Sequence, residues 1–255
     1  MTRNIRQAAL PWLLGGVGIL TLMLFWWAWL GPLDGLGRLG NLFTPQATLI
    51  SLTELLGRAE LYEHIAASLQ RVLVGLGLAL LFGIPLGLLV GASHYVEWAT
   101  TPVFQFLRMI SPLSWMPIAV MVLGVGNKPI YFLLAFAAVW PILLNTASGV
   151  KQLDPRWLQL TRSLSATRRE LLFQVILPGI LGNILTGVRL AIGILWIILV
   201  PCEMLGVSSG LGYYILDTRD RLAYSELMAM VVLIGFLGFF LDALARIAYR
   251  RWAKG

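Results

Sequence analysis

Long apolar runs constrain this chain more than any other feature of its sequence. A helix needs roughly 20 mostly apolar residues to cross a bilayer, and several segments of the 255-residue chain meet that requirement. Hydrophobic residues make up 58% of the chain and charged residues only 12%, whereas charged residues make up about 25% of a typical soluble domain. The mean hydropathy is +0.82. The sequence therefore predicts an all-α polytopic membrane protein.

Six segments have the length and composition of transmembrane helices. The apolar part of the first, after Arg3 and Arg6, is too long for a signal peptide and lacks a small-residue cleavage site, so we expect a retained span. The third is interrupted by Arg108, Pro112 and Pro117, and such breaks are tolerated only where protein or water satisfies the freed backbone groups. We expect a single transmembrane domain over residues 1–255, with spans at about 9–30, 65–91, 99–123, 129–150, 178–204 and 226–249.

A polar segment, residues 44–65, joins the first expected span to the second. Its leucines follow a helical period, at Leu49, Leu52, Leu55 and Leu56. This pattern predicts a partly amphipathic helix that lies at the membrane interface.

The basic residues predict the orientation of the chain in the membrane. With six spans, both termini lie on the same side. If that side is the cytoplasm, the inner segments carry eleven of the 19 Lys and Arg residues, the outer segments carry five, and three lie within spans. The positive-inside rule therefore predicts cytoplasmic termini. The net charge of +7 then reflects topology, and we expect no nucleic-acid partner.

Signals for catalysis are absent from the sequence. Cys202 is the only cysteine and His64 and His94 are the only histidines, so we expect neither a disulfide nor a Cys/His metal site. No Gly-Lys dipeptide occurs, which excludes a phosphate-binding P-loop. "GLGRLG" (35–40) fits the dinucleotide-binding pattern but follows an apolar span instead of a strand, so we interpret it as a glycine-rich turn. We expect no catalytic residue and no cofactor in this chain.

Four ionisable residues fall within the expected spans, where a charge is expensive and marks a candidate functional position. Arg71 lies near the outer end of its span, so we expect its side chain to snorkel to the interface. Arg189 lies about 16 Å beyond Pro178, near the midplane, either lining a solute path or pairing with a carboxylate or backbone carbonyls. Glu203 lies about 21 Å further, close to the outer boundary. Arg108 fits either snorkelling or a path. The substrate-path candidates are Arg189, Glu203 and Arg108.

Residues 151–177 form the largest loop on the predicted cytoplasmic side, and their sequence predicts two short helices. Asp154 before Pro155 is an N-cap with proline at the first helical position. Thr167 and Glu170 have capping-box spacing for a second helix, which Pro178 should end or kink. The pair could dock a partner protein or lie as an amphipathic loop on anionic headgroups. At the predicted outer face, "GVSSGLGYYI" (206–215) could be a re-entrant turn, a gate or a plain loop.

The loop resembles the EAA loop of bacterial ABC-importer permeases, which reads Glu-Ala-Ala, three residues, Gly, nine residues, Ile-x-Leu-Pro. All intervals and the Leu-Pro ending match, whereas the Glu, the Ala pair and the Gly are replaced. The positions of this chain that correspond to the named residues of the pattern are Gln159, Leu160, Thr161, Ser165, Val175, Leu177 and Pro178. "SPLSWMPIAVMVLG" and the stretch from Gly179 to Ile215 are similar to the nitrate/sulfonate/taurine branch, and the resemblance covers residues 60–250.

The resemblance implies a type I ABC-importer permease fold in the bacterial inner membrane, with a cytoplasmic coupling-helix loop. It implies import of a small anionic or zwitterionic solute such as nitrate, a sulfonate or taurine. The implied partners are a second permease copy, two cytoplasmic ABC ATPase subunits that hold ATP and Mg, an extracytoplasmic solute-binding protein, and membrane lipids. The implied ATPase-coupling residues are Gln159, Leu160, Thr161, Leu164, Ser165, Ala166, Leu177 and Pro178.

Two other classes of protein share the predicted membrane topology. An ion-gradient-driven secondary transporter or channel is disfavoured because carboxylates for proton or sodium coupling are scarce within the spans, with Glu203 the clear one. A membrane-embedded enzyme is disfavoured because the sequence carries no nucleophile or metal set. The balance of three span arginines against one glutamate favours an anionic solute.

Overall fold

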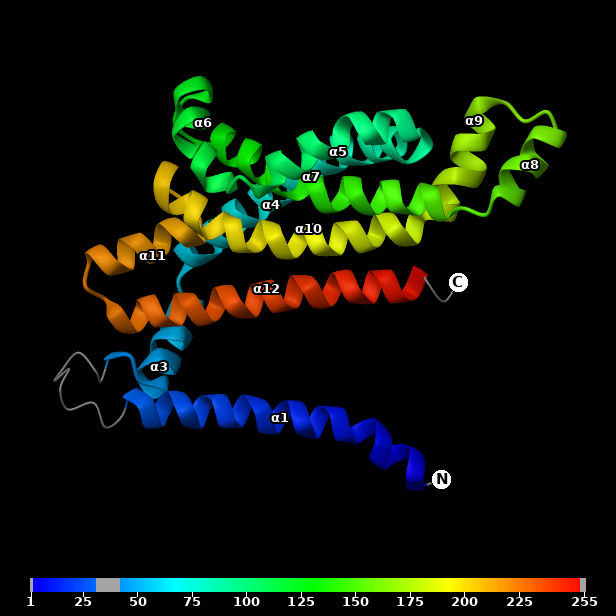
Figure 1. Ribbon diagram of the computed structural model, residues 1–255. Coiled ribbons are helices and arrows are strands. Elements are labelled where there is room, and N and C mark those ends of the chain that lie inside the picture. Colours follow the sequence, from blue (N-terminus) through cyan, green and yellow to red (C-terminus); the bar gives the residue numbers. More distant parts are fainter. Residues whose placement is uncertain (1, 31–41, 253–255) are drawn as a thin grey trace. The chain divides into compact units, whose positions relative to one another are not determined.

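The computed structural model describes the backbone of residues 2–30 and 42–252 and the side chains of 14–28, 42–161 and 163–247. Every regular element over this range is helical (Figure 1). "GLGRLG" (35–40) lies outside the described residues. The elements are α1 (Thr2–Leu30), α3 (Pro45–Leu56), α4 (Ala59–Ala92), α5 (His94–Met109), η2 (Pro112–Trp115), α6 (Met116–Leu123), α7 (Asn127–Gln152), α8 (Pro155–Ser163), α9 (Arg168–Glu170), η3 (Leu171–Ile176), α10 (Leu177–Gly206), α11 (Leu211–Asp220) and α12 (Tyr224–Trp252).

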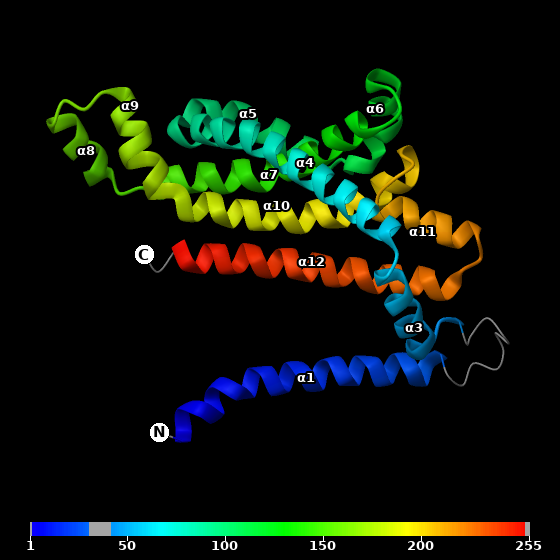
Figure 2. The same cartoon turned by 180° about the vertical axis from the view of Figure 1, so that it is seen from behind.

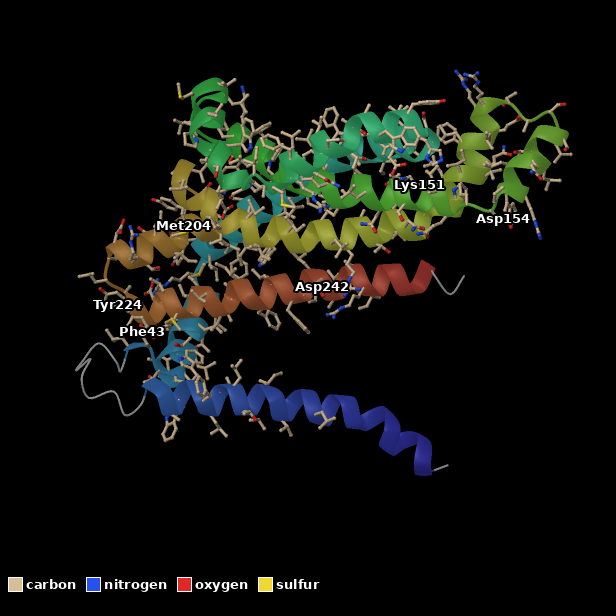
Figure 3. All side chains as sticks on the ribbon, in the orientation of Figure 1. Phe43, Lys151, Asp154, Met204, Tyr224 and Asp242 are labelled. Atoms are coloured by element: carbon tan, nitrogen blue, oxygen red, sulfur yellow. The ribbon has the colours of Figure 1, made fainter. Side chains whose placement is uncertain are left out.

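The chain divides into two compact units. The larger contains Tyr62–Tyr214 and the described residues from Ile234 onward, and the smaller contains the described residues up to Leu61 and Ile215–Leu233. In the smaller unit, Arg58 pairs with Glu226 at 3.0 Å and the Phe43 and Tyr224 rings lie 5.5 Å apart (Figure 3).

Four helices of the described chain are long and apolar enough to cross a membrane. They contain the second, fourth and fifth expected spans and all but the last two residues of the sixth. A pair bent by 86°, α5 with η2–α6, makes a fifth if it counts as one span. Within α1, only a shorter apolar stretch, Leu14–Ala28, has fully described residues. The prediction of an all-helical membrane chain is confirmed with four or five spans. The four helices are Ala59–Ala92, Asn127–Gln152, Arg168–Gly206 and Tyr224–Ile247.

The third expected span breaks at the proline that interrupts it. Ser111, the residue before Pro112, is extended at φ −57° and ψ 128°, because a proline disfavours helical geometry in the residue that precedes it. Pro112 then opens η2, where its missing N–H is not needed. The expected interruption of the 99–123 segment is therefore present, at Pro112, and the two halves are bent by 86°.

The first part of the segment 44–65 forms the expected helix as α3. Thr44 caps it by accepting a hydrogen bond from the Ala47 N–H at 3.4 Å, and Pro45 stands at its first position. Leu55 is fully buried, whereas Leu49 and Leu56 are exposed. The leucine period therefore predicted the helix, although only part of its apolar face packs against protein.

The core of the larger unit lies between α4, α7 and α10. Leu133 and Leu134 of α7 and Leu195 and Leu199 of α10 are fully buried in one cluster. A glycine row on α4 lets its backbone approach α7 closely, because a Cβ atom on any of them would lie 2.9 Å or less from an α7 atom. With Ala79 between Gly75 and Gly83, small residues recur every four positions, a spacing that is typical of packed membrane helices. The result is a tightly packed frame that positions the sites below (Figures 1 and 2). The glycines are Gly75, Gly83, Gly87 and Gly91.

Candidate functional site

Two adjoining cavities lie beside the C-terminal end of α5, next to the break between α5 and η2. The first has a volume of about 410 Å³ and lies against α10 at Leu190, Ile194 and Ile198, which share one helix face. The second has a volume of about 240 Å³ and lies between α5 and α7. Because both are lined by Arg108, Trp140 and Leu144, we call them together the Arg108 groove.

The Arg108 groove carries two nitrogen donors without protein acceptors. Among the described side chains, Arg108 makes no hydrogen bond and has no carboxylate within ion-pair distance. Trp140 is held between the Phe104 ring at 5.7 Å and the Phe136 ring at 5.5 Å. Its Nε1 is buried without a hydrogen-bond partner in the described part of the chain. The Trp140 indole N–H is a buried donor that is costly to leave unsatisfied, and Arg108 is an exposed residue whose guanidinium donors have no partner among the described residues, so both groups point to a polar occupant.

The far end of the second cavity carries a charge cluster. Glu97 of α5 pairs with Lys151 of α7, and His94 Nδ1 lies 3.6 Å from the Glu97 carboxylate (Figure 3). Among the described residues that line the groove, Glu97 is the one acidic residue, and Lys151 and His94 already engage it. The groove as a whole therefore carries a surplus of positive charge.

Arg71 and Glu203 form a buried ion pair in the larger unit. Arg71 Nη1 lies 2.6 Å from Glu203 Oε1, and the two residues are 2% and 0% exposed. Arg71 also donates to the Asn127 Oδ1 and, through Nη1 and Nη2, to the carbonyl and hydroxyl of Ser209, at 2.7–2.9 Å. The Ser68 hydroxyl lies 2.8 and 2.9 Å from the two Glu203 carboxylate oxygens. The prediction that Arg71 snorkels to the interface is wrong, because its side chain is paired inside the protein.

The ion pair fastens the glycine-rich segment 206–215 to α4 and α10. Gly210 has a φ of +109°, and a Cβ on it would lie 2.4 Å from Arg71 Nη1, so only glycine fits there. Its N–H donates to His64 Nδ1 at 3.0 Å. The N–H groups of Leu211 and Gly212, which open α11, donate to Ser68 and to Glu203 at 2.8 and 2.9 Å. The segment is thus a short anchored turn that leads into a helix, with Glu203 accepting one of the free N–H groups of that helix.

Arg189 is paired with a carboxylate that the sequence reasoning missed. Its Nε lies 3.3 Å from Asp242 Oδ1, and Asp242 Oδ2 lies 3.2 Å from Arg246 Nη2, one helical turn further along α12 (Figure 3). The Arg189 and Asp242 side chains are 45% and 37% exposed. Asp242 falls inside the sixth expected span, so the count of one carboxylate against three arginines is wrong. Arg189 was expected either to line a solute path or to pair with a carboxylate or backbone carbonyls, and the structure contains the carboxylate partner.

The loop between α7 and α10 forms the expected first helix and capping box. Asp154 Oδ1 accepts the Arg156 N–H at 2.9 Å where α8 begins. The Thr167 backbone N–H and hydroxyl donate to the Glu170 carboxylate at 2.7 and 2.8 Å, which holds the pKa of Glu170 below its usual value. Ser165, at the position where the EAA pattern has glycine, is left-handed with a φ of 54°. The side chain of Arg162 lies outside the described residues.

The second helix of this loop does not end before Pro178, which was one of the two predicted outcomes, and its turn is distorted there instead. It does not end near Leu177, because the π-helical turn η3 joins α9 to α10 and the backbone stays helical from Arg168 to Gly206. Pro178 is accommodated at the start of α10, just after the wider turn. The eight coupling candidates therefore fall in two places. Gln159, Leu160, Thr161, Leu164, Ser165 and Ala166 lie around the hairpin tip, and Leu177 and Pro178 lie at its base.

Comparison with known proteins decides the family. A family model described as "Binding-protein-dependent transport system inner membrane component" matches residues 83–254. This chain belongs to that family. It is 37% identical over 184 residues to the nitrate import permease protein of Leptolyngbya laminosa, and the aligned region covers 72% of this chain and 66% of that protein. It is 32% identical over 240 residues to the taurine transport system permease protein of Escherichia coli K12, with 92% and 87% covered.

Two further comparisons concern length and fold. A bicarbonate transport system permease protein of Synechocystis is 38% identical over 71% of this chain, and the match covers 65% of that protein. The chain thus spans slightly under two thirds of the nitrate and bicarbonate permeases. A chain of the inward-facing MetNI methionine ABC transporter superimposes with a TM-score of 0.65 at 15% identity, covering 76% of this chain and 96% of that one. A chain of a bacterial alginate ABC transporter gives 0.61 at 15% identity, with 97% and 96% covered. The fold is therefore that of ABC-transporter membrane chains.

Proposed function

We propose that this chain is the transmembrane permease subunit of an ATP-driven ABC importer for a small anionic or zwitterionic solute. Its membership of the binding-protein-dependent family supports this proposal most directly. The names of its relatives narrow the solute to the class of nitrate, bicarbonate, taurine and aliphatic sulfonates. The chain itself is not the catalyst, and ATP with Mg binds to a separate ATPase subunit.

In this proposal both units form one permease domain with six spans. α1 is the first span, the bent pair α5 and η2–α6 is the third, and both termini face the cytoplasm. The distribution of Lys and Arg supports this orientation, because it places the loop between α7 and α10 on the basic, cytoplasmic side. Two copies pack together, since one six-helix chain leaves little room for a solute path.

The α8–α9 hairpin is the proposed coupling element. It projects beyond the ends of α7 and α10 (Figure 2), and Leu160 and Leu164 near its tip are 57% and 72% exposed. Exposed leucines on a short helical projection suit insertion into a groove of a cytoplasmic ATPase subunit, one subunit for each permease copy. Closure of the ATPases on ATP would then favour one state of the permease pair over the other. A solute-binding protein delivers the solute at the outer face.

We expect ATP-driven uptake from the complete assembly. The chain, its ATPase and its binding protein would be reconstituted in proteoliposomes and given labelled nitrate, bicarbonate or taurine. Uptake of at least one of these solutes should require ATP and the binding protein, and the ATPase should copurify with the chain. Uptake that continues without ATP and stops when an ionophore dissipates the ion gradients would instead identify a secondary transporter.

Arg189 remains a proposed path residue, together with Arg108, while Glu203 supports the outer end of the path from within the protein. We expect Arg189→Gln to lower uptake by about tenfold, the effect of losing one charge interaction near 1.4 kcal/mol. Arg246→Gln is the matched control, because it leaves the Arg189–Asp242 pair in place and removes a same-helix pair worth about 0.5 kcal/mol or less. If Arg189→Gln with Asp242→Asn restores uptake, Arg189 only neutralises Asp242 and does not meet the solute.

A further inference from the structure

The three span arginines that the sequence singled out have different environments. Arg71 pairs with Glu203 and Arg189 pairs with Asp242. Arg108 has no carboxylate partner among the described side chains, although it lies in the last turn of α5, within the bent pair of helices that passes the span test together. An ionised side chain at membrane depth requires a charge partner, polar contacts or water. Arg108 is therefore the one of the three whose partner is missing from the described chain.

The surroundings of Arg108 resemble a binding site more than a packing defect. It lines both cavities of the Arg108 groove, whose walls are largely apolar where α10 contributes Leu190, Ile194 and Ile198. Trp140 also lines both cavities and carries the unpartnered indole N–H. An apolar cavity with a few convergent donors is the usual form of a small-molecule site.

The donor set selects the charge of the occupant. A guanidinium offers a rigid fork of N–H groups that matches the paired oxygens of a carboxylate, nitrate or sulfonate, and it donates to anions better than to neutral acceptors. An indole N–H only donates. The acidic residue that lines the groove, Glu97, is held by Lys151 and His94. A cation would therefore find no free acceptor of negative charge along the described lining.

We propose that Arg108 and Trp140 form an anion subsite in the Arg108 groove, where a small oxyanion pauses on its way through the membrane. The guanidinium binds the oxyanion, and the Trp140 N–H, which is buried in this structure, contributes a further hydrogen bond once the indole turns toward the groove. The identity of this anion as the transported solute rests on the proposed function. The preference of the groove for anions does not rest on the proposed function, and a separate experiment measures it.

The charge preference is tested with a single cysteine in the groove. Leu144 lines both cavities and is 38% exposed, so Leu144→Cys places a thiol beside Arg108 and Trp140. The native Cys202 is fully buried, and the unsubstituted chain measures its background. The full chain in membrane vesicles would react with 2-sulfonatoethyl methanethiosulfonate, itself a sulfonate, and with the cationic trimethylammonioethyl analogue. The rates are divided by those for a free thiol in solution.

We expect the sulfonate reagent to be favoured over the cationic reagent by about tenfold after this correction, because one nearby positive charge attracts one and repels the other. Adding Arg108→Gln should remove the preference. Lys128→Gln is the matched control and should keep it, because Lys128 lies about 24 Å along α7 from residue 144, well beyond the screening length. A thiol that reacts with neither reagent, or a preference that survives Arg108→Gln, would overturn the subsite.

Transport distinguishes this proposal from the proposed function. In the reconstituted importer, Arg108→Gln should lower uptake at least tenfold with normal copurification of the ATPase, Arg108→Lys should retain part of it, and Trp140→Phe should lower it a few-fold. If the unsubstituted importer is active and Arg108→Gln does not alter uptake, the subsite is not on the path and the proposal fails alone. If the unsubstituted assembly shows no ATP-driven uptake, the proposed function fails while the thiol rates still decide the anion site. Loss of dimer formation in Arg108→Gln would assign Arg108 to a carboxylate of the second copy and contradict the subsite.

Discussion

Replacing Leu164, Ser165 and Ala166 with aspartates is expected to abolish ATP-driven uptake while the chain still inserts into the membrane. Leu164 is 72% exposed at the hairpin tip, so its substitution disturbs little within the chain. If the tip inserts into a groove of the ATPase, each new carboxylate becomes buried without a partner, which costs several kcal/mol. Uptake should fall below detection, since the hairpin links ATP binding to the spans. Copurification of the ATPase measures the loss of docking, and uptake by proteoliposomes made from the same preparation measures the loss of transport.

The control for this variant uses the conformation of Ser165. Its φ of 54° lies in the left-handed region, which glycine adopts without strain, so Ser165→Gly should leave uptake intact. Normal uptake by the triple aspartate variant at normal expression would contradict the coupling role of the hairpin. Loss of membrane insertion in that variant would be separated from uncoupling by comparing the amounts of chain in the membrane.

Features set by neighbouring residues were predictable from the sequence. The four helices that are long and apolar enough to cross a membrane each contain a long stretch of high hydropathy with few charged residues, which is the signal that predicted them. Asp154 and the Thr167–Glu170 capping box act over two or three residues, and both have the expected hydrogen bonds. The left-handed residue at Ser165 also coincides with the position where the EAA pattern has glycine. Each of these features depends on contacts close in the chain.

Features that depend on packing were not predictable in the same way. Pro112 marks where the third span breaks, but the 86° bend depends on how both halves pack against other helices. The π-helical turn η3 is similar, because Pro178 disfavours an ordinary helix before it without deciding whether the chain stops or widens its turn. The local signal gave the position of both changes and left their geometry open.

The partners of Arg71 and Arg189 could not be identified from the sequence, where Arg71 was expected to snorkel and a carboxylate partner of Arg189 was one of two interpretations. The partner of Arg71 lies 132 residues away, and that of Arg189 lies 53 residues away. One signal was present in the sequence. His64, Ser68 and Arg71 lie at i, i+4 and i+7, which is one face of a helix, and a polar row within an apolar helix indicates polar contacts inside the protein.

Breaking the Arg71–Glu203 pair is expected to destabilise the chain more than any other single change considered. Glu203→Gln keeps the shape of the side chain but leaves the Arg71 guanidinium buried without its counter-charge, which costs about 3–5 kcal/mol. The apparent melting temperature of the purified chain in detergent should fall by on the order of 10 °C. Arg219→Gln is the control, because the Arg219–Asp220 pair is 58% and 66% exposed and should contribute at most about 1 kcal/mol.

The double variant Arg71→Met with Glu203→Leu separates the ion pair from the anchored turn. Removing both charges avoids an unpaired buried ion, so the double variant should melt above either single variant. It should remain below the unsubstituted chain, because the Ser209 carbonyl and hydroxyl lose the Arg71 donors and the Gly212 N–H loses its acceptor. Gly210→Ala should lower the melting temperature about as much as Glu203→Gln, because its Cβ would displace the Arg71 guanidinium that the ion pair requires. If the double variant melts no higher than Glu203→Gln, the buried charges are not what the single variant leaves uncompensated, and the ion pair does not hold the turn.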